Sequence, residues 1–296
     1  MASDFATSPT TMATYDEVSY AAWITDEVMA ALMARIVSVP LLRAESLVGK
    51  ASKAYKFPKA AKHTAAAVAE GVESANTALT TTAVTITAAE IAFQATVTDV
   101  LDLSEIAGAS DSRILSIGRA LADKIDVDIM ALLAGFTASV GTTTVDLSLD
   151  NILDGIYTLE AADAASLGSV VFLGHPRQTG DIRQALKSQQ SVANIQHSIR
   201  FGSGETGKLG PAPGYFGEWF GVDFYNSTNS PSINAGADRS GALFIRDLAL
   251  GKVTKYDVRV EPMRWAPIRG WVFVGSADYG VGMIEDAAGV EVVSDL

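Results

Sequence analysis

The stretch DSRILSIGRALADKIDVDIMALLAGF, residues 111–136, carries the most regular helical pattern in the chain. Apolar residues recur every three or four positions and would line one face of a helix. This stripe consists of Ile114, Ile117, Leu121, Ile125, Ile129 and Leu132. The pattern predicts a helix that is capped by Asp111 or Ser112 and runs to about Phe136. At ~1.5 Å per residue the helix would be roughly 39 Å long, about twice the mean for globular proteins, which indicates an elongated domain.

Opposite charges lie four residues apart on the other face of this helix. Arg119 precedes Asp123, and Lys124 precedes Asp128. Pairs at this spacing support an exposed helical face. Residues 141–144, a glycine followed by three threonines, are expected to end the helical region.

A row of lysines precedes the helix, and its spacing does not fit a helix. The lysines occupy every third position, at Lys50, Lys53, Lys56, Lys59 and Lys62. A spacing of three drifts around an α-helix, and Phe57-Pro58 would break one. Residues 47–63 are therefore predicted to be extended, with Tyr55 and Phe57 as apolar anchors. A solvated, lysine-rich strand is the simplest interpretation of the lysines themselves.

Residues 79–98 form a second strand-like segment. Val84 and Ile86 alternate with threonines, and the alternation continues through Ile91 and Phe93, as is typical of strands. Residues 64–78, between the two segments, are small, polar and unpatterned. The two segments predict a long two-stranded arm with a loose tip. Because an isolated hairpin buries too little to be stable, we expect the arm to lie on another surface.

The N-terminal residues 1–18 are polar and contain no Lys or Arg, so they lack the basic start of a secretion signal. Two interpretations stay open: a disordered arm, or an arm that orders on a neighbouring subunit. An amphipathic helix is predicted from about Ser19 to Val37, with Pro40 just beyond its end. No uncharged stretch reaches the ~20 apolar residues that span a bilayer, so no membrane segment is predicted.

From about residue 148 the pattern changes to an alternation of helices and strands. Helices are predicted at residues 149–163 and from Pro176 to about 187, and residues 202–221 read as a long loop rich in Gly and Pro. Strands are predicted at residues 169–173, 242–246, 252–261, 270–274 and 290–293.

Composition excludes several classes of protein. With 296 residues, 48% hydrophobic and 19% charged, the chain is not low-complexity disorder. The 22 Lys+Arg against 34 Asp+Glu give a net charge of −12, which does not favour a basic nucleic-acid-binding surface. The absence of cysteine excludes disulfides, thiolate metal sites and cysteine nucleophiles.

The sequence offers no credible active site. Residues 202–208, GSGETGK, match the spacing of a phosphate-binding loop, but Leu209 stands where Ser or Thr would hold Mg²⁺, and the following GPAPG cannot open a helix. His63 and His197 have no partner at ligand spacing, and His175 is expected to cap a helix. No catalytic residue, metal ligand or cofactor is predicted, and the chain is not predicted to be an enzyme.

The order of these elements resembles the tailed-bacteriophage major capsid protein family, whose fold is shared with encapsulins and the herpesvirus capsid floor. Residues 57–59 (FPK), 69–73 (AEGVE) and 84–87 (VTIT) look like the extended loop of that family. Residues 111–136 look like the spine helix of its peripheral domain, and residues 174–176 (GHP) look like the first strand–helix step of its axial domain.

The C-terminal third carries two further resemblances. Residues 258–274, with Arg264 and Arg269 on either side of Trp265, look like the return strands that pack beside the spine helix. Residues 277–282 (ADYGVG) look like the final re-entry into the axial sheet.

The resemblance implies an α+β fold with an extended β-hairpin loop. Its expected parts are the N-terminal arm and first helix (1–39), the extended loop or two-stranded arm (40–98), the peripheral domain with the spine helix (99–147), the axial domain (148–251), the return strands of the peripheral domain (252–279) and the C-terminal strand of the axial domain (280–296).

The family implies a shell protein that forms pentamers and hexamers and closes into an icosahedron around double-stranded DNA. The expected partners are further copies of the chain, a separate scaffolding protein, a portal and decoration proteins, and the expected location is a virion assembled in the bacterial cytoplasm. We expect Tyr55, Phe57 and Lys59 to anchor the loop on an adjacent subunit. The full set of expected intersubunit contacts is Tyr55, Lys56, Phe57, Lys59, Lys62, Glu70, Glu73, Arg264 and Arg269.

Two other functions stay open. An encapsulin-like compartment would have a similar fold but enclose enzymes instead of DNA. A nucleotide-dependent enzyme would use Lys208, against which Leu209 argues. Family members that cross-link their subunits use a lysine and an asparagine, and no such pair is matched here, so no cross-link is predicted.

Overall fold

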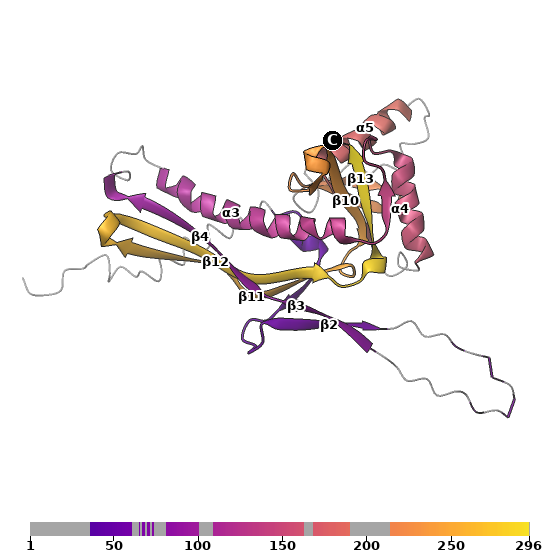
Figure 1. Ribbon diagram of the computed structural model, residues 1–296, viewed down its shortest axis with the longest axis horizontal. Helices are drawn as coiled ribbons and strands as arrows, with labels where there is room; N and C mark the ends of the chain where they lie inside the picture. The colour runs from indigo at the N-terminus through magenta and orange to yellow at the C-terminus, as the bar shows by residue number, and fades with distance from the viewer. Residues whose placement is uncertain are drawn as a thin grey trace, which may run out of the picture.

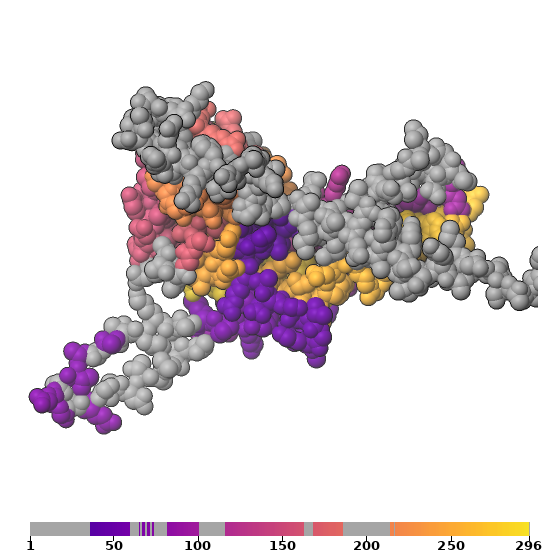
Figure 2. Space-filling view, turned by 180° about the vertical axis from the view of Figure 1, so that it is seen from behind, coloured from indigo at the N-terminus to yellow at the C-terminus, as the bar shows by residue number. Residues whose placement is uncertain are grey.

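The computed structural model describes residues 36–60, 65, 67–68, 70–71, 73, 81–100, 109–162, 168–189 and 214–295. These residues form two sheets, a separate hairpin and three long helices. The four-stranded sheet extends to one side of the seven-stranded sheet, and the hairpin projects from the region where they meet (Figure 1). The elongated outline is also evident from behind (Figure 2). The predicted α+β class is confirmed.

The elongated half is a four-stranded sheet with one long helix along it. Its strands follow the order β1 (Arg43–Ser46), β11 (Leu250–Trp265), β12 (Gly270–Met283) and β4 (Ala89–Thr98). Only the β1–β11 pairing is parallel. Helix α3 (Ala109–Ala131) packs on β12 and β4 (Figure 1). Gly275 permits the close approach, because a Cβ there would lie 2.4 Å from Cγ2 of Ile117. The β11–β12 ladder shifts register on both sides of Tyr256.

The compact half is a seven-stranded sheet. Its strands follow the order β5 (Ser139–Gly141), β13 (Gly289–Asp295), β10 (Asp238–Ile245), β6 (Val170–Gly174), β8 (Val222–Asn226) and β7 (Tyr215–Trp219), and β9 (Ser232–Ile233) pairs with β10. Helices α4 (Leu149–Ala161) and α5 (Pro176–Gln189) share one apolar cluster with this sheet, in which Ile152, Leu159 and Ile182 meet Phe224 and Leu243. Because β6 is buried at all five positions, it forms the centre of this half.

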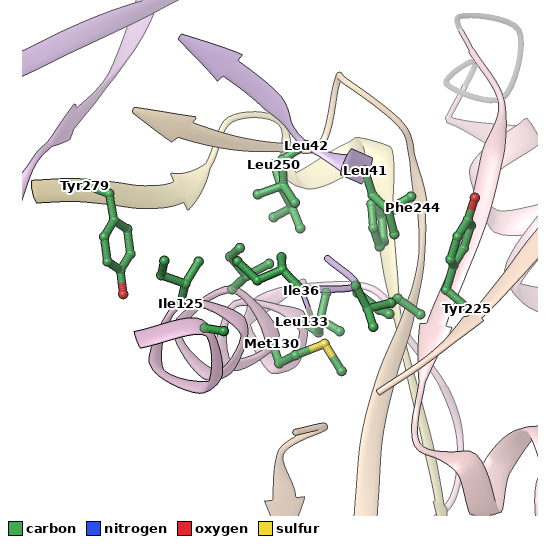
Figure 3. Packing of buried hydrophobic residues seen from close by; sticks show 14 of the residues in the cluster. Ile36, Leu41, Leu42, Ile125, Met130, Leu133, Tyr225, Phe244, Leu250 and Tyr279 are labelled. Carbon is green, nitrogen blue, oxygen red and sulfur yellow. The ribbon is translucent and has the colours of Figure 1, made fainter. Parts of the chain in front are cut away.

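One apolar core joins the two halves. Ile125 and Met130 of α3, with Leu133 just after it, point toward Phe244 of β10 and Leu250 of β11 (Figure 3). Full burial of each such side chain stabilises the fold by roughly 1.5–3 kcal/mol. The short 3-10 helix η1 (Val39–Leu41) adds Leu41 to the same core. The two sheets therefore share a continuous interior.

The third sheet is the hairpin of β2 (Ala54–Ala60) and β3 (Thr81–Thr87). It is antiparallel, with Tyr55 opposite Ile86 and Phe57 opposite Val84. The prediction that the lysine-rich segment is extended and forms a two-stranded arm is confirmed for these residues.

The prediction that the whole of residues 79–98 belongs to that arm is wrong. The segment divides at Ala88, which is buried and whose N–H donates to the carbonyl of Lys53 at 2.8 Å. After this point β4 leaves the hairpin and pairs with β12 along its length. Alternation of apolar residues identifies a strand but not its partner, because both pairings bury the same face.

The ends of the long helix also differ from the prediction. Helix α3 begins at Ala109, so Asp111 and Ser112 lie within its first turn and do not cap it. It ends at Ala131, a 3-10 turn, η2 (Leu133–Gly135), follows, and residues 139–141 form β5 beside β13. The helical stripe itself is confirmed where it is described: Ile117, for example, is fully buried.

Two predictions in the C-terminal half are wrong. Residues 215–219, expected to lie in a loop, form the edge strand β7, and the rest of the expected loop up to residue 213 lies outside the described residues. Residues 277–282 do not enter the axial sheet but remain in β12 of the four-stranded sheet. The return to the seven-stranded sheet is made by β13.

The remaining predicted elements agree with the structure within a few residues. Helices α4 and α5 and strands β6, β10, β11, β12 and β13 lie where they were expected, although β11 and β12 are longer. The predicted first helix falls outside the described residues, apart from Ile36 and Val37, which are not helical. Within the described ranges, no helix is long and apolar enough to cross a membrane.

Candidate assembly surfaces

The base of the hairpin is held by an apolar cluster of its own chain. Phe57 is fully buried and packs with Leu47, Ile86, Val253 and Ile284. The neighbouring ring of Tyr55 meets that of Phe57 edge-on at 4.8 Å, an arrangement that aromatic pairs favour. Because its whole side chain is covered within one chain, Phe57 holds the arm on its own subunit here, and an anchoring role on an adjacent subunit stays a prediction.

Cationic side chains reinforce this attachment. The Arg43 guanidinium lies 5.5 Å from the Phe57 ring centroid, and the Lys50 ammonium lies 5.7 Å from that of Tyr55, within the range of cation–π attraction. Lys59 forms an ion pair with Glu285 at 2.5 Å. Part of the lysine row thus binds within the chain and is not simply solvated.

The other expected contact residues of the arm are less enclosed. Lys56 is exposed on the face of β2 opposite to Phe57, and no contact within the described chain engages its ammonium. Glu70 and Glu73 are exposed, and Lys62 lies outside the described residues. Of this set, Lys56 is the cation best placed to meet another molecule.

The far end of the four-stranded sheet carries an ordered ion pair. Arg264 donates two parallel hydrogen bonds to Asp99, of 2.6 and 2.7 Å. These bonds and the positive charge hold the pKa of Asp99 below its usual value and raise that of Arg264. The guanidinium also lies 5.7 Å from the Trp271 ring centroid. A fork-shaped pair beside an indole has a fixed geometry, although both groups remain largely in water.

A tight turn places Arg269 beside this pair. The 3-10 turn η6 (Ala266–Ile268) leads to Arg269 in the left-handed conformation, with φ of 47°. The carbonyl of Arg269 accepts a hydrogen bond from the Asp99 N–H at 2.8 Å, which ties the turn to the end of β4. The structure thus brings Arg264 and Arg269 together beside Asp99, and the outer end of β11 and β12 lies away from the hairpin (Figure 1).

Large apolar side chains are exposed around the same turn. Met263 is 53% exposed, Trp265 45% and Trp271 37%. The exposure of both tryptophans favours an interface over a core. Met263 was not predicted, although its place on the more exposed face of an alternating strand was a usable signal. Exposed Trp, Met and Arg are the residue types that dominate protein interfaces.

A shallow groove runs between α3 and the edge strand β4. It has a volume of about 360 Å³ and is lined by Ile91, Phe93, Ala120, Leu121 and Lys124. Phe93 is 40% exposed there. Among the described residues β4 pairs only with β12, so it is the edge strand of this part of the sheet.

Side chains suited to metal or cofactor chemistry do not converge in the part of the chain that the structure describes. No group of three or more His, Asp or Glu residues there could hold a metal ion. The glycine-rich residues 202–208 lie outside the described residues. His175 precedes α5, and its Nδ1 accepts from the Arg177 N–H at 3.2 Å, as expected for a helix-capping residue. Burial lowers the pKa of this histidine.

Comparison with known proteins extends these observations. No protein-family description and no curated sequence matches the chain. Among solved structures, the capsid of cyanophage P-SCSP1u shares 15% identity, with a TM-score of 0.60 and 88% of each chain covered. The chain has the tailed-phage capsid fold. A chain of Mycobacterium phage Che8 matches with a TM-score of 0.66 and 18% identity over 88% of this chain and 91% of that one.

The same fold recurs in a particle that is not described as a phage. A virus-like particle from Pyrococcus furiosus matches with a TM-score of 0.57 and 12% identity, covering 93% of this chain and all of the other. The division of the chain into a peripheral domain around α3 and an axial domain stays a prediction.

Proposed function

We propose that this chain is the major capsid protein of a tailed bacteriophage, and that its copies assemble as pentamers and hexamers into an icosahedral shell around double-stranded DNA. The observation that carries the proposal is the match of 88% of the chain to a phage capsid subunit. The role is structural and not enzymatic. The proposal places the protein in the virion, after assembly in the bacterial cytoplasm.

The surfaces of the chain suit a shell subunit. Its exposed features lie at separate extremities: Lys56 on the hairpin, and Arg264, Arg269 and Trp265 at the far end of the four-stranded sheet. A subunit with several small contact sites can join several neighbours at once. Many weak contacts become cooperative once a lattice forms, because each bound neighbour raises the effective concentration of the next.

The charge of the chain suits a container for DNA. Each cation placed on a phosphate adds salt-dependent affinity, and a shell multiplies this by its copy number. A subunit with a net charge of −12 can enclose DNA without holding it tightly. Further partners under this proposal are a separate scaffolding protein, a portal and decoration proteins.

The alternative is a protein compartment of the encapsulin type that encloses other proteins. The likeness to the virus-like particle from Pyrococcus furiosus supports it. The contents of the particle distinguish the two functions, because the fold is common to both.

Electron microscopy of the purified protein tests the proposal. Closed shells of uniform diameter are the expected result, and a protein that stays monomeric at all concentrations and salt conditions would refute it. Particles from the native source should then be treated with nuclease and opened. Protected double-stranded DNA supports the phage capsid, and protected protein cargo without DNA supports the compartment.

Lys56→Glu tests the arm in the same assay. Because Lys56 is exposed and without a partner in the described chain, the substitution should leave the thermal unfolding of the free chain unchanged and reduce the yield of shells. Lys124→Glu is the matched control for folding, because it breaks an exposed pair with Asp128 and should slightly lower stability. Normal yield from Lys56→Glu would show that the hairpin does not use this charge.

A further inference from the structure

Asp126 is a buried carboxylate in α3, only 2% exposed, whose described partners are all neutral. Its Oδ1 accepts from the N–H and the hydroxyl of Ser38, at 3.2 and 2.5 Å. Its Oδ2 accepts from the Ser227 hydroxyl at 2.6 Å and from the Asn229 amide at 3.1 Å. No Lys, Arg or His of the described ranges forms an ion pair with it. Burying a charge is costly unless hydrogen bonds replace its water, and these four donors do so.

The donors come from both halves of the molecule. Ser38 precedes η1 in the segment that leads into β1 of the four-stranded sheet. Ser227 and Asn229 follow β8 of the seven-stranded sheet, and the Ser227 N–H is fixed to the carbonyl of Gly174 at 3.0 Å. Asp126 itself lies on the helix that covers the four-stranded sheet. One side chain therefore binds both sheets at their junction.

The rest of this junction is apolar. The side chains around Ile125, Met130 and Phe244 hold the halves together by burial (Figure 3). Burial is non-directional and is compatible with small rotations, whereas hydrogen bonds weaken steeply when their angles change. The apolar core therefore provides most of the attraction, and the bonds to Asp126 provide direction.

We propose that Asp126 fixes the angle between the two sheets and thereby determines the geometry with which one copy of the chain meets the next. It is a positioning residue, since it lies in no contact surface itself. The proposal rests on the proposed function as a shell subunit, but the angle is a property of a single chain and can be measured without a shell.

The dimensions of the subunit make this angle important. Asp126 lies 17 residues after the start of α3, or about 26 Å along the helix at 1.5 Å per residue. A rotation of about 7° at the junction moves the far end by about 3 Å, close to the ~3.3 Å rise of one residue in a strand. Contacts around Arg264 and Trp265 would then lose their register with the neighbouring copy.

A distance measurement within one chain tests the angle directly. Because the sequence contains no cysteine, spin labels attach only to cysteines that are introduced. Gln94→Cys on β4 and Glu160→Cys on α4 provide two exposed sites for them. The variant is Asp126→Asn, which keeps the volume but offers an N–H₂ group to the donors of one side. We expect a broader distribution of label distances, or a second distance, in the unassembled chain.

Asp128→Asn is the matched control on the same helix. Asp128 accepts from the Tyr279 hydroxyl at 2.7 Å and from Lys124 at 2.6 Å, and both partners belong to the elongated half. Its loss should lower the melting temperature without altering the label distances. If Asp126→Asn does not fold, Ser227→Ala removes one of the four bonds and should give a smaller broadening. The proposal would be overturned if the label distances are unchanged in every folded variant of Asp126 and Ser227. It would also be overturned if Asp128→Asn broadens the label distances equally.

Electron microscopy of the same variants links the angle to assembly. We expect wild-type and Asp128→Asn chains to give shells of one diameter, and Asp126→Asn to give mixed diameters or open sheets. Uniform wild-type shells from Asp126→Asn would refute the assembly role. If the wild-type chain forms no shells, the proposed function fails, while the label distances still decide whether Asp126 fixes the angle.

Discussion

Replacement of Phe57 by alanine tests whether the hairpin is held by its own chain or waits for a neighbour. Phe57 is fully buried: its ring lies among Leu47, Val253 and Ile284, and its Cζ would lie 3.2 Å from a Cβ at position 251. The site is bounded by backbone as well as side chains, so it cannot collapse easily. Truncation of a buried Phe in such a place costs about 3–5 kcal/mol.

This cost should fall on the hairpin and not on the whole molecule. The Phe57 cluster is separate from the two larger cores, so its loss should promote local opening of β2 and β3. Since about 1.4 kcal/mol corresponds to a factor of ten, amides in the β2–β3 ladder should exchange with solvent about 100- to 4,000-fold faster. The measurement is hydrogen exchange by mass spectrometry on the unassembled chain, with peptides that cover residues 54–60 and 81–87.

Lys56→Ala is the control, because Lys56 directly precedes Phe57 in the same strand but points to the exposed face. It should leave the exchange of these amides nearly unchanged. Equal exchange rates in Phe57→Ala and the unaltered chain would refute the reasoning. It would mean that the hairpin base does not pack in the free chain and that a neighbouring copy supplies its stability.

Three further predictions test the fold and its charges. Lys59→Glu places a second carboxylate beside Glu285 and should lower the free energy of unfolding by up to about 1 kcal/mol in urea titrations, an effect that should shrink in high salt. Gly275→Ala should lower the free energy of unfolding by about 1–3 kcal/mol, because the new Cβ would press on Ile117. Gly180→Ala is the control: a Cβ there meets nothing within 4 Å, so the substitution should stabilise α5 by about 0.5–1 kcal/mol. A similar loss of stability from both variants would exclude close packing at Gly275 as the cause. Burial raises the pKa of the Asp181 carboxyl above 3.8, so the folded chain binds the carboxyl proton more tightly than the unfolded chain does. The folded state therefore loses stability as the pH rises from 3.8 through the raised pKa. Asp181→Asn should flatten that decline in unfolding midpoints measured across the acidic range, and an unaltered pH profile would contradict the assignment.

Periodicity was sufficient to locate most elements of the fold. The buried stripe of α3 and the apolar run of β6 were predicted because burial on one face or on both imposes a pattern on the sequence. The partners of strands were not encoded in this way. Residues 89–98 alternate equally well for the hairpin and for the edge of β12, and only the three-dimensional arrangement decides between them.

The contact surfaces were only partly predictable. Aromatic residues in a lysine-rich strand look alike whether they bind a neighbour or their own chain, and Phe57 binds its own chain because β1, β11 and the end of β12 converge beneath it. Arg264 and Arg269 were expected to contact another subunit, and that expectation stays a prediction. Their bidentate and backbone links to Asp99 depend on two segments that are far apart in sequence, so no local pattern could indicate them.

The irregular ladder between β11 and β12 has a mechanical consequence. Two register shifts flank Tyr256, where the regular hydrogen bonds of the longest strand pair are interrupted. From Arg259 to the turn at residues 266–268 the ladder is uninterrupted, so the outer part of the two strands should move as one rigid unit. In a filled shell of the proposed kind, bending under internal pressure would concentrate around Tyr256. Strain would then be absorbed there before it reached the proposed contacts at the outer end.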